Sequence, residues 1–245
     1  MEVHAHTHTA RKKWTHYFWE FLMLFLAVFC GFFAEYQLEH QIEKDREKQY
    51  IHSILEDLRE DTLVLTDNID QFNEHLTRND TLIRLLNSPD IKEHGSDLYY
   101  LGRRASRSVR LAIHDATIQQ LKNSGGLRLI RNQKVSKAVI EYYNRLVFID
   151  YLQAIAFNEA DEYRKMAIDV FHPILFNDII MADNTVMRPP GNPSLLTYDP
   201  KILIRLSGMV NYLRNTKLGL ANAESEMKEA AKQLIGLIKN EYHLK

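Results

Sequence analysis

The sequence has 245 residues, of which 45% are hydrophobic and 26% are charged, which is typical of a folded protein and excludes a disordered chain. The net charge of −1 at pH 7 gives the molecule no overall bias toward nucleic acid or anionic lipid, so we predict no nucleic-acid partner. Cys30 is the only cysteine, which excludes an intrachain disulfide framework.

The first 14 residues form a short polar tail that contains His4, His6 and His8. Clustered histidines can bind Zn²⁺ or Ni²⁺, but a terminus this short and polar is more typical of a disordered tail. We predict a cytoplasmic tail over residues 1–14, with no metal site there and no cofactor or metal elsewhere.

Residues 17–36 read YFWEFLMLFLAVFCGFFAEY, and residues 21–34 carry no charged side chain. Twenty helical residues rise about 30 Å, the thickness of the hydrocarbon layer, and Trp or Tyr residues flank both ends. This pattern predicts a transmembrane helix over residues 15–36. A cleaved signal peptide would need small residues where Phe32 and Phe33 stand.

Glu20 is the one acidic residue near the start of this span. It either reaches the headgroup region or pairs with a partner helix, since burial deep in the bilayer costs about 2.5–3.5 kcal/mol. Arg11, Lys12 and Lys13 precede the span, whereas the residues after it are acidic until Lys44. The positive-inside rule therefore places the N-terminus in the cytoplasm and the bulk of the chain outside.

A second helix pattern continues from the span over residues 37–88. Apolar residues recur there in steps of four and three, with two polar exceptions, and Pro89 ends the pattern. The predicted seam consists of Ile51, Leu55, Leu58, Thr62, Leu65, Ile69, Phe72, Leu76, Asn79, Ile83 and Leu86. We expect this seam to pack against later helices of the chain or against a second protomer.

Residues 89–245 are predicted to form a helical bundle outside the cytoplasm. Helices are expected near residues 96–107, 117–124 and 133–171, and again from residue 199 to the C-terminus. Gly125 and Gly126 follow a helix and predict at least one positive φ. The predicted fold is all-α: an N-terminal transmembrane helix that continues into a long acidic helix, followed by an extracytoplasmic bundle.

Charge is segregated along the chain. Residues 35–76 contain twelve acidic and four basic residues, whereas residues 91–140 contain ten basic and three acidic ones. Arg103, Arg107 and Arg110 have the spacing of one helical face and are our candidate interaction residues, together with Glu20. The arginines either bind an anionic partner or pack against the acidic helix of the same chain.

Two segments resemble a family of uncharacterised bacterial single-pass membrane proteins. One is EFLMLFLAVFCGFFAEYQLEHQIEKDREKQYIHSILEDLRED, a Glu-led span with a charged helix after it. The other is TIQQLKNSGGLRLIRNQKVSKAVIEYYN, with Leu121, Ser124 and Gly125 in a Leu-x-x-Ser-Gly block and Tyr142 and Tyr143 at its end. The resemblance implies that the chain is anchored in the inner membrane of a bacterium, with its bulk in the periplasm. It does not imply any biochemical activity.

No catalytic motif stands out, and we predict that the chain is not an enzyme. It has no glycine-rich phosphate loop, nucleophile elbow or His-Glu-x-x-His motif, and two residues with metal-ligand spacing, His52 and Glu56, do not make a site. We expect a membrane-anchored interaction or scaffold module that contacts the lipid bilayer and an envelope protein or another copy of itself. The alternative is a sensory or ligand-binding module that acts through a partner membrane protein.

Overall fold

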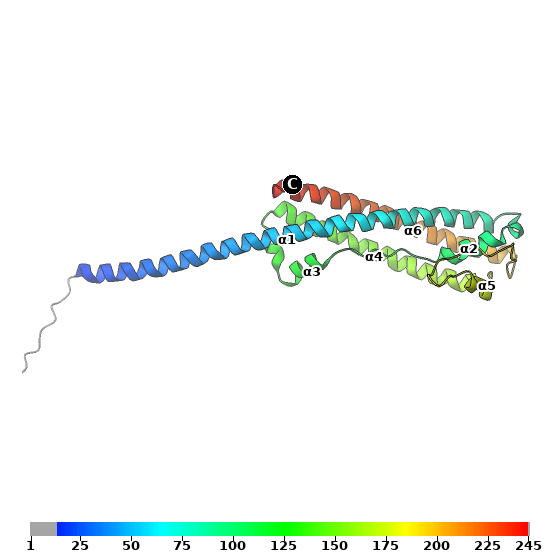
Figure 1. Ribbon diagram of the computed structural model, residues 1–245, viewed down its shortest axis with the longest axis horizontal. Helices are drawn as coiled ribbons and strands as arrows, with labels where there is room; N and C mark the ends of the chain where they lie inside the picture. The colour runs from blue at the N-terminus through cyan, green and yellow to red at the C-terminus, as the bar shows by residue number, and fades with distance from the viewer. Residues whose placement is uncertain (1–13, 245) are drawn as a thin grey trace, which may run out of the picture. The chain divides into compact units, whose positions relative to one another are not determined.

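The computed structural model describes residues 14–244, and the predicted all-α class is confirmed over that part of the chain. The helices are α1 (Trp14–Leu86), α2 (Gly95–Ala105), α3 (Ala116–Asn123), α4 (Gln133–Ala167), α5 (Pro173–Asp178) and α6 (Pro200–Glu241) (Figure 1). Two short 3-10 turns, Ile91–Glu93 and Gly126–Leu129, connect some of them. The histidine tail lies outside the described residues.

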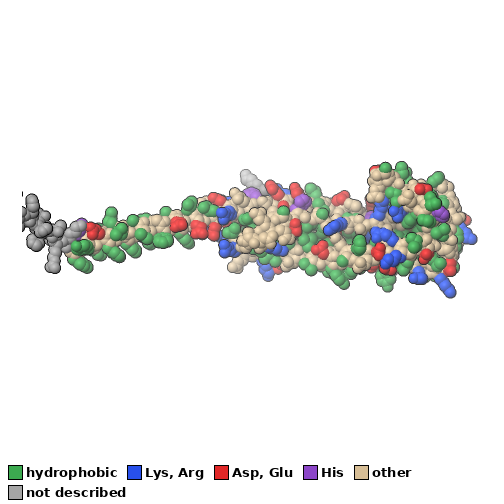
Figure 2. Space-filling model, turned by 90° about the horizontal axis from the view of Figure 1, so that it is seen from below, with side chains coloured by type: hydrophobic (Ala, Val, Ile, Leu, Met, Phe, Trp, Pro, Cys, Tyr) green, Lys and Arg blue, Asp and Glu red, His purple; other side chains and the backbone are tan. Residues whose placement is uncertain are grey.

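The chain divides into two compact units, which meet in sequence between Tyr50 and Ile51, within α1. In the first unit, α1 contains a segment that is long and apolar enough to cross a membrane, and none of that segment is buried. Figure 2 shows hydrophobic side chains along this part of the molecule. Exposure of so many aromatic side chains to water is unfavourable, so the composition of this segment fits a lipid environment.

The second unit is a bundle built on α4, α6 and the part of α1 from Ile51 onward (Figure 1). Helices α4 and α6 are antiparallel, because Asn132 before α4 donates to Glu241 at the end of α6 at 2.5 Å. The C-terminal part of α1 is tied to the first half of α6 through Arg214, which binds Asp80 at 2.8 Å. Each of these long helices buries one face in a shared core.

One end of the bundle holds a continuous apolar cluster to which α1, α2, α4 and α6 all contribute. Phe171 lies at its centre, with its ring stacked on Phe176 at 4.8 Å and edge-on to Tyr99 at 5.3 Å. Gly102 of α2 is packed directly against Phe171, since a Cβ atom there would meet the ring at 2.4 Å. This close approach explains why a glycine stands inside a helix.

Most of the predicted seam of α1 is buried, but the buried face is broader than the stripe we expected. Phe72 is buried as predicted. At four levels the residue before the predicted one points inward instead. Three of these residues are polar, namely Asp61, Asn68 and His75, and the fourth is Leu82. Apolar character alone misled the prediction at Asp61, Asn68 and His75, because these polar side chains lie beside other polar groups of the bundle interior.

Helix α2 ends earlier than predicted, at Ala105. The carbonyl of Ala105 accepts from Lys217 at 2.7 Å, and the carbonyl of Ser106 accepts from Arg164 at 3.4 Å. These side chains satisfy groups that another helical turn would have used, so the chain leaves the helix and crosses toward α3. The positive φ predicted for the Gly125–Gly126 pair is confirmed at Gly125, whose φ is 67°.

Candidate functional site

The three arginines proposed as one interaction face do not share a face, because only Arg103 lies within α2. Its guanidinium stacks over the ring of Phe176 at 5.1 Å. Arg107 donates to the carbonyl of Asn184 at 2.7 Å. Arg110 lies further along the irregular segment, at the rim of a hollow beside α4. The prediction of a common helical face was wrong because α2 stops before Arg107.

Glu20 lies in the first unit with its side chain half exposed. Its Oε1 atom is 3.0 Å from Nε2 of His16, one turn earlier on the same helix. The structure thus gives Glu20 a partner on its own helix, close to the start of the apolar segment. Pairing with a separate helix stays a prediction.

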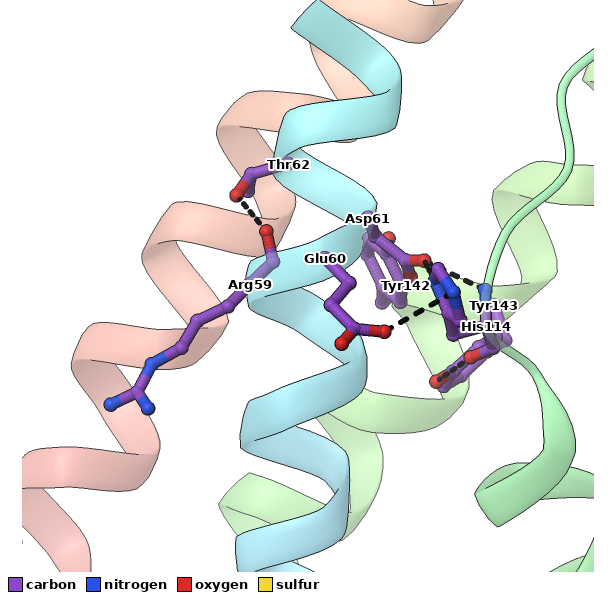
Figure 3. Close-up of polar contacts among 7 residues, drawn as sticks. All are labelled: Arg59, Glu60, Asp61, Thr62, His114, Tyr142 and Tyr143. Carbon is purple, nitrogen blue, oxygen red and sulfur yellow. Dashed lines mark hydrogen bonds and ion pairs between the residues drawn. The ribbon is translucent and has the colours of Figure 1, made fainter.

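A cluster of polar side chains joins α1, α4 and the segment that leads to α3 (Figure 3). Asp61 is fully buried at its centre. One of its oxygens accepts from the backbone N–H of His114 at 2.8 Å and lies 3.2 Å from Nδ1 of that ring, and the other accepts from Tyr142 at 2.8 Å. Burial raises the pKa of Asp61, while the hydrogen bonds from His114 and Tyr142 oppose that rise.

His114 is held from two sides. Its Nε2 atom is 3.2 Å from a carboxylate oxygen of Glu60, and its backbone carbonyl accepts from Tyr143 at 3.2 Å. Burial, followed by the charge of Asp61, raises the pKa values of both Tyr142 and Tyr143, so these hydroxyls stay protonated donors. The arrangement fastens the irregular segment to two helices.

This geometry favours a structural role for His114 over general acid–base catalysis. A catalytic imidazole needs one ring nitrogen aimed at the substrate. Here both nitrogens face carboxylate oxygens of α1, at 3.2 Å each. Among the described residues, no group of three or more His, Cys, Asp or Glu side chains is placed to hold a metal ion.

Two further polar levels follow Asp61 along the interior of the bundle, at intervals of seven residues. Asn68 faces Glu224 of α6, which is fully buried. His75 lies near Lys217, which is also buried and donates to Ala105. We call Asp61, Asn68 and His75, together with Glu224 and Lys217, the polar core.

Burial shifts the pKa values in the polar core toward neutral forms. It raises the pKa of Glu224 to about 7 and lowers that of Lys217 to about 8. It lowers the pKa of His75 to about 3, and the charge of Lys217 adds to that effect. Both carboxylate oxygens of Glu224 lack a hydrogen-bond partner, so its ionised form is costly in place.

Helix α4 carries several large apolar side chains that the bundle leaves exposed. Val147, Phe148 and Tyr151 are exposed by 73%, 57% and 61%. Exposed Asn144 precedes them by one turn, and exposed Asn158 follows two turns later. We call Val147, Phe148 and Tyr151 the α4 ridge.

The polar core and the α4 ridge were not among the features predicted from the sequence. The seven-residue spacing of Asp61, Asn68 and His75 was the available signal for the first. The ridge gives little signal, because Val147, Phe148 and Tyr151 sit in a helix that also buries Tyr142, Tyr143 and Ile149. Which apolar residues of such a helix remain outside depends on how the other helices pack.

Comparisons with protein-family models, with curated proteins and with solved structures find no match to this chain. The family resemblance of the two sequence segments therefore stays a prediction. What can be said of function rests on the geometry of the chain itself.

Proposed function

We propose that this chain is a membrane-anchored helical interaction module that associates with a second copy of itself through the α4 ridge. The observation that carries the proposal is the exposure of Val147, Phe148 and Tyr151 on one helix face. A folded domain in water rarely leaves adjacent large apolar side chains uncovered unless they bind something.

The first unit supplies the anchor of this proposal. Its apolar segment meets the length requirement for a membrane span, and basic residues precede it while acidic ones follow. This charge asymmetry supports a cytoplasmic N-terminus and a bundle on the other side of a bacterial inner membrane. Copies confined to one membrane surface meet at a high effective concentration, which favours weak self-association.

The chemistry of the ridge supports a second copy as its occupant. A twofold contact places the same patch of each copy against itself, so a patch with a net charge would repel its partner. The ridge itself has no charged member, exposed Arg145 and Asp150 beside it carry opposite charges, and Asn144 and Asn158 can hydrogen-bond across a contact. An apolar centre with a polar border is typical of protein interfaces.

Orientation can be tested with single cysteines in a Cys30→Ala background. We choose Ala5→Cys in the N-terminal tail and Asp70→Cys on the exposed side of α1. In cells with a permeabilised outer membrane, an impermeant thiol reagent should label position 70 and leave position 5 unlabelled. Labelling at position 5 alone would overturn the orientation.

Self-association can be tested in native membranes with the same background. Tyr151→Cys, treated with a bifunctional maleimide, should give a covalent dimer of the 28.8 kDa chain. Asp70→Cys is the matched control, since it is exposed but lies away from the ridge. Equal cross-linking of the two variants would indicate random collision and would contradict the proposal.

A further inference from the structure

A hollow of about 340 Å³ opens beside α4, next to the irregular segment that links α2 to α3. That segment contributes Val109 and Arg110, α4 contributes Asp150, Gln153 and Phe157, and α6 contributes Leu220. The volume lies at the lower end of the range for small-molecule sites. It exists because an extended segment, which is thinner than a helix, runs past α4 at this level.

The hollow brings together opposite charges that have no partner in the protein. Within residues 14–244, neither the guanidinium of Arg110 nor the carboxylate of Asp150 takes part in an ion pair or a side-chain hydrogen bond. The amide nitrogen of Gln153 is buried and also lacks a hydrogen-bond partner. Buried polar groups are normally satisfied, so an unpaired donor in a hollow points to a missing acceptor.

The backbone beside the hollow offers further donors. Between Ser108 and Ile113, the main-chain groups form no hydrogen bonds with other described residues. The remaining walls are apolar: Val109 and Leu220 are buried, and the ring of Phe157 stands 67% exposed at the edge. A ligand would therefore meet one cation, one anion, the unpaired amide of Gln153 and an apolar surface.

We infer that this hollow binds a small zwitterion, namely a free α-amino acid with an apolar side chain. Its carboxylate pairs with Arg110 and accepts from the Gln153 amide, its ammonium group pairs with Asp150, and its side chain lies against Phe157 and Leu220. Both charged side chains are exposed at the hollow, and an amino acid carries both opposite charges within a few bonds of each other. The inference concerns one copy of the chain and does not depend on self-association.

The probes are L-leucine and two analogues that each lack one charge. Leucinamide has no carboxylate, and 4-methylpentanoate has no ammonium group. With the full-length chain in detergent, leucine should raise Tm in a saturable way, with a Kd in the millimolar range or tighter. Each analogue should bind at least about tenfold more weakly, because it leaves one protein charge unpaired.

Substitutions at the hollow test whether leucine binds there. Arg110→Gln and Asp150→Asn should each weaken leucine binding about tenfold or more, without changing Tm in the absence of leucine, since neither group has a partner to lose. Arg205→Gln is the matched control, because Arg205 is exposed on α6 and is not part of the hollow. Failure of leucine to shift Tm, or an equal shift in the parent chain and in Arg110→Gln, would overturn the inference.

Discussion

The two parts of the bundle interior are built on different principles. At one end, Leu82, Tyr163 and Phe171 belong to a continuous apolar cluster. Along the middle, Asp61, Asn68 and His75 place a polar side chain inward at every heptad. The apolar end supplies favourable burial energy, whereas the polar levels cost energy unless each finds its own partner.

The difference shows how long helices avoid sliding past one another. An apolar stripe fits its neighbour almost equally well after a shift of seven residues. A shift of α1 that put His75 at the level of Glu224 would bring Leu82 toward Lys217, which would then lie against an apolar side chain. The polar core thus specifies the register of α1 against α6, as single polar residues do in coiled coils.

The largest effect should come from the apolar end. Phe171→Ala removes a ring that contacts Tyr99 and Phe176, and truncation of a buried Phe typically costs about 3–5 kcal/mol. Urea unfolding of the full chain in detergent measures this change. Phe148→Ala, at an exposed position, should stay within about 0.5 kcal/mol of the parent. Similar losses in both variants would remove the distinction between buried and exposed rings.

The next largest effect should come from Asp61. Asp61→Ala leaves the hydroxyl of buried Tyr142 and the backbone N–H of His114 without their acceptor. We expect a loss of about 2–3 kcal/mol in the free energy of unfolding, the range for hydrogen bonds to a charged group. Glu60→Ala removes the other carboxylate beside His114, but that contact is exposed and should contribute at most about 1 kcal/mol.

Glu224 should make stability depend on pH. Because burial raises its pKa from 4.5 to about 7, the folded chain holds a proton that the unfolded chain releases in that interval. The stability that protonation provides is therefore complete below about pH 4.5 and is lost as the pH rises through about 7. Glu224→Gln cannot ionise, so near pH 8 it should exceed the parent by on the order of 3 kcal/mol.

The control is the same comparison of unfolding free energies, made at low pH. Near pH 4 the parent carries a neutral Glu224, so parent and Glu224→Gln should agree within error. A constant offset at both pH values would mean that the substitution acts through packing rather than through charge. In that case the polar core would not be the source of the pH dependence.

The smallest effect on stability should come from glycine positions outside the apolar end and the polar core, where only backbone conformation changes. Gly125→Val forces a β-branched residue into a left-handed conformation with φ near 67° and should cost about 1 kcal/mol. Gly208→Ala, at an exposed helical site with open space around its Cα atom, should instead gain up to about 1 kcal/mol. Melting curves that shift in the same direction would contradict the assignment of the turn.

Local patterns predicted the long helices and the burial of Phe72, because helix periodicity and breakers such as Pro89 act over a few residues. The same patterns did not predict that α2 ends at Ala105. That end depends on Lys217, which lies 112 residues away in the sequence. Hydropathy also left Asp61 out of the predicted seam, since its partners Tyr142 and His114 are brought to it only by the fold.

The association of two chains through the α4 ridge is the central claim, and energy transfer between labelled full-length chains in lipid vesicles tests it directly. Tyr151→Asp would place a charge in the centre of the proposed contact and should weaken association at least about tenfold while leaving the fold of the single chain intact, because Tyr151 is exposed in it. Phe171→Ala is the counterpart, since it should lower Tm and leave association below the melting transition intact. Unchanged energy transfer in Tyr151→Asp would contradict the account.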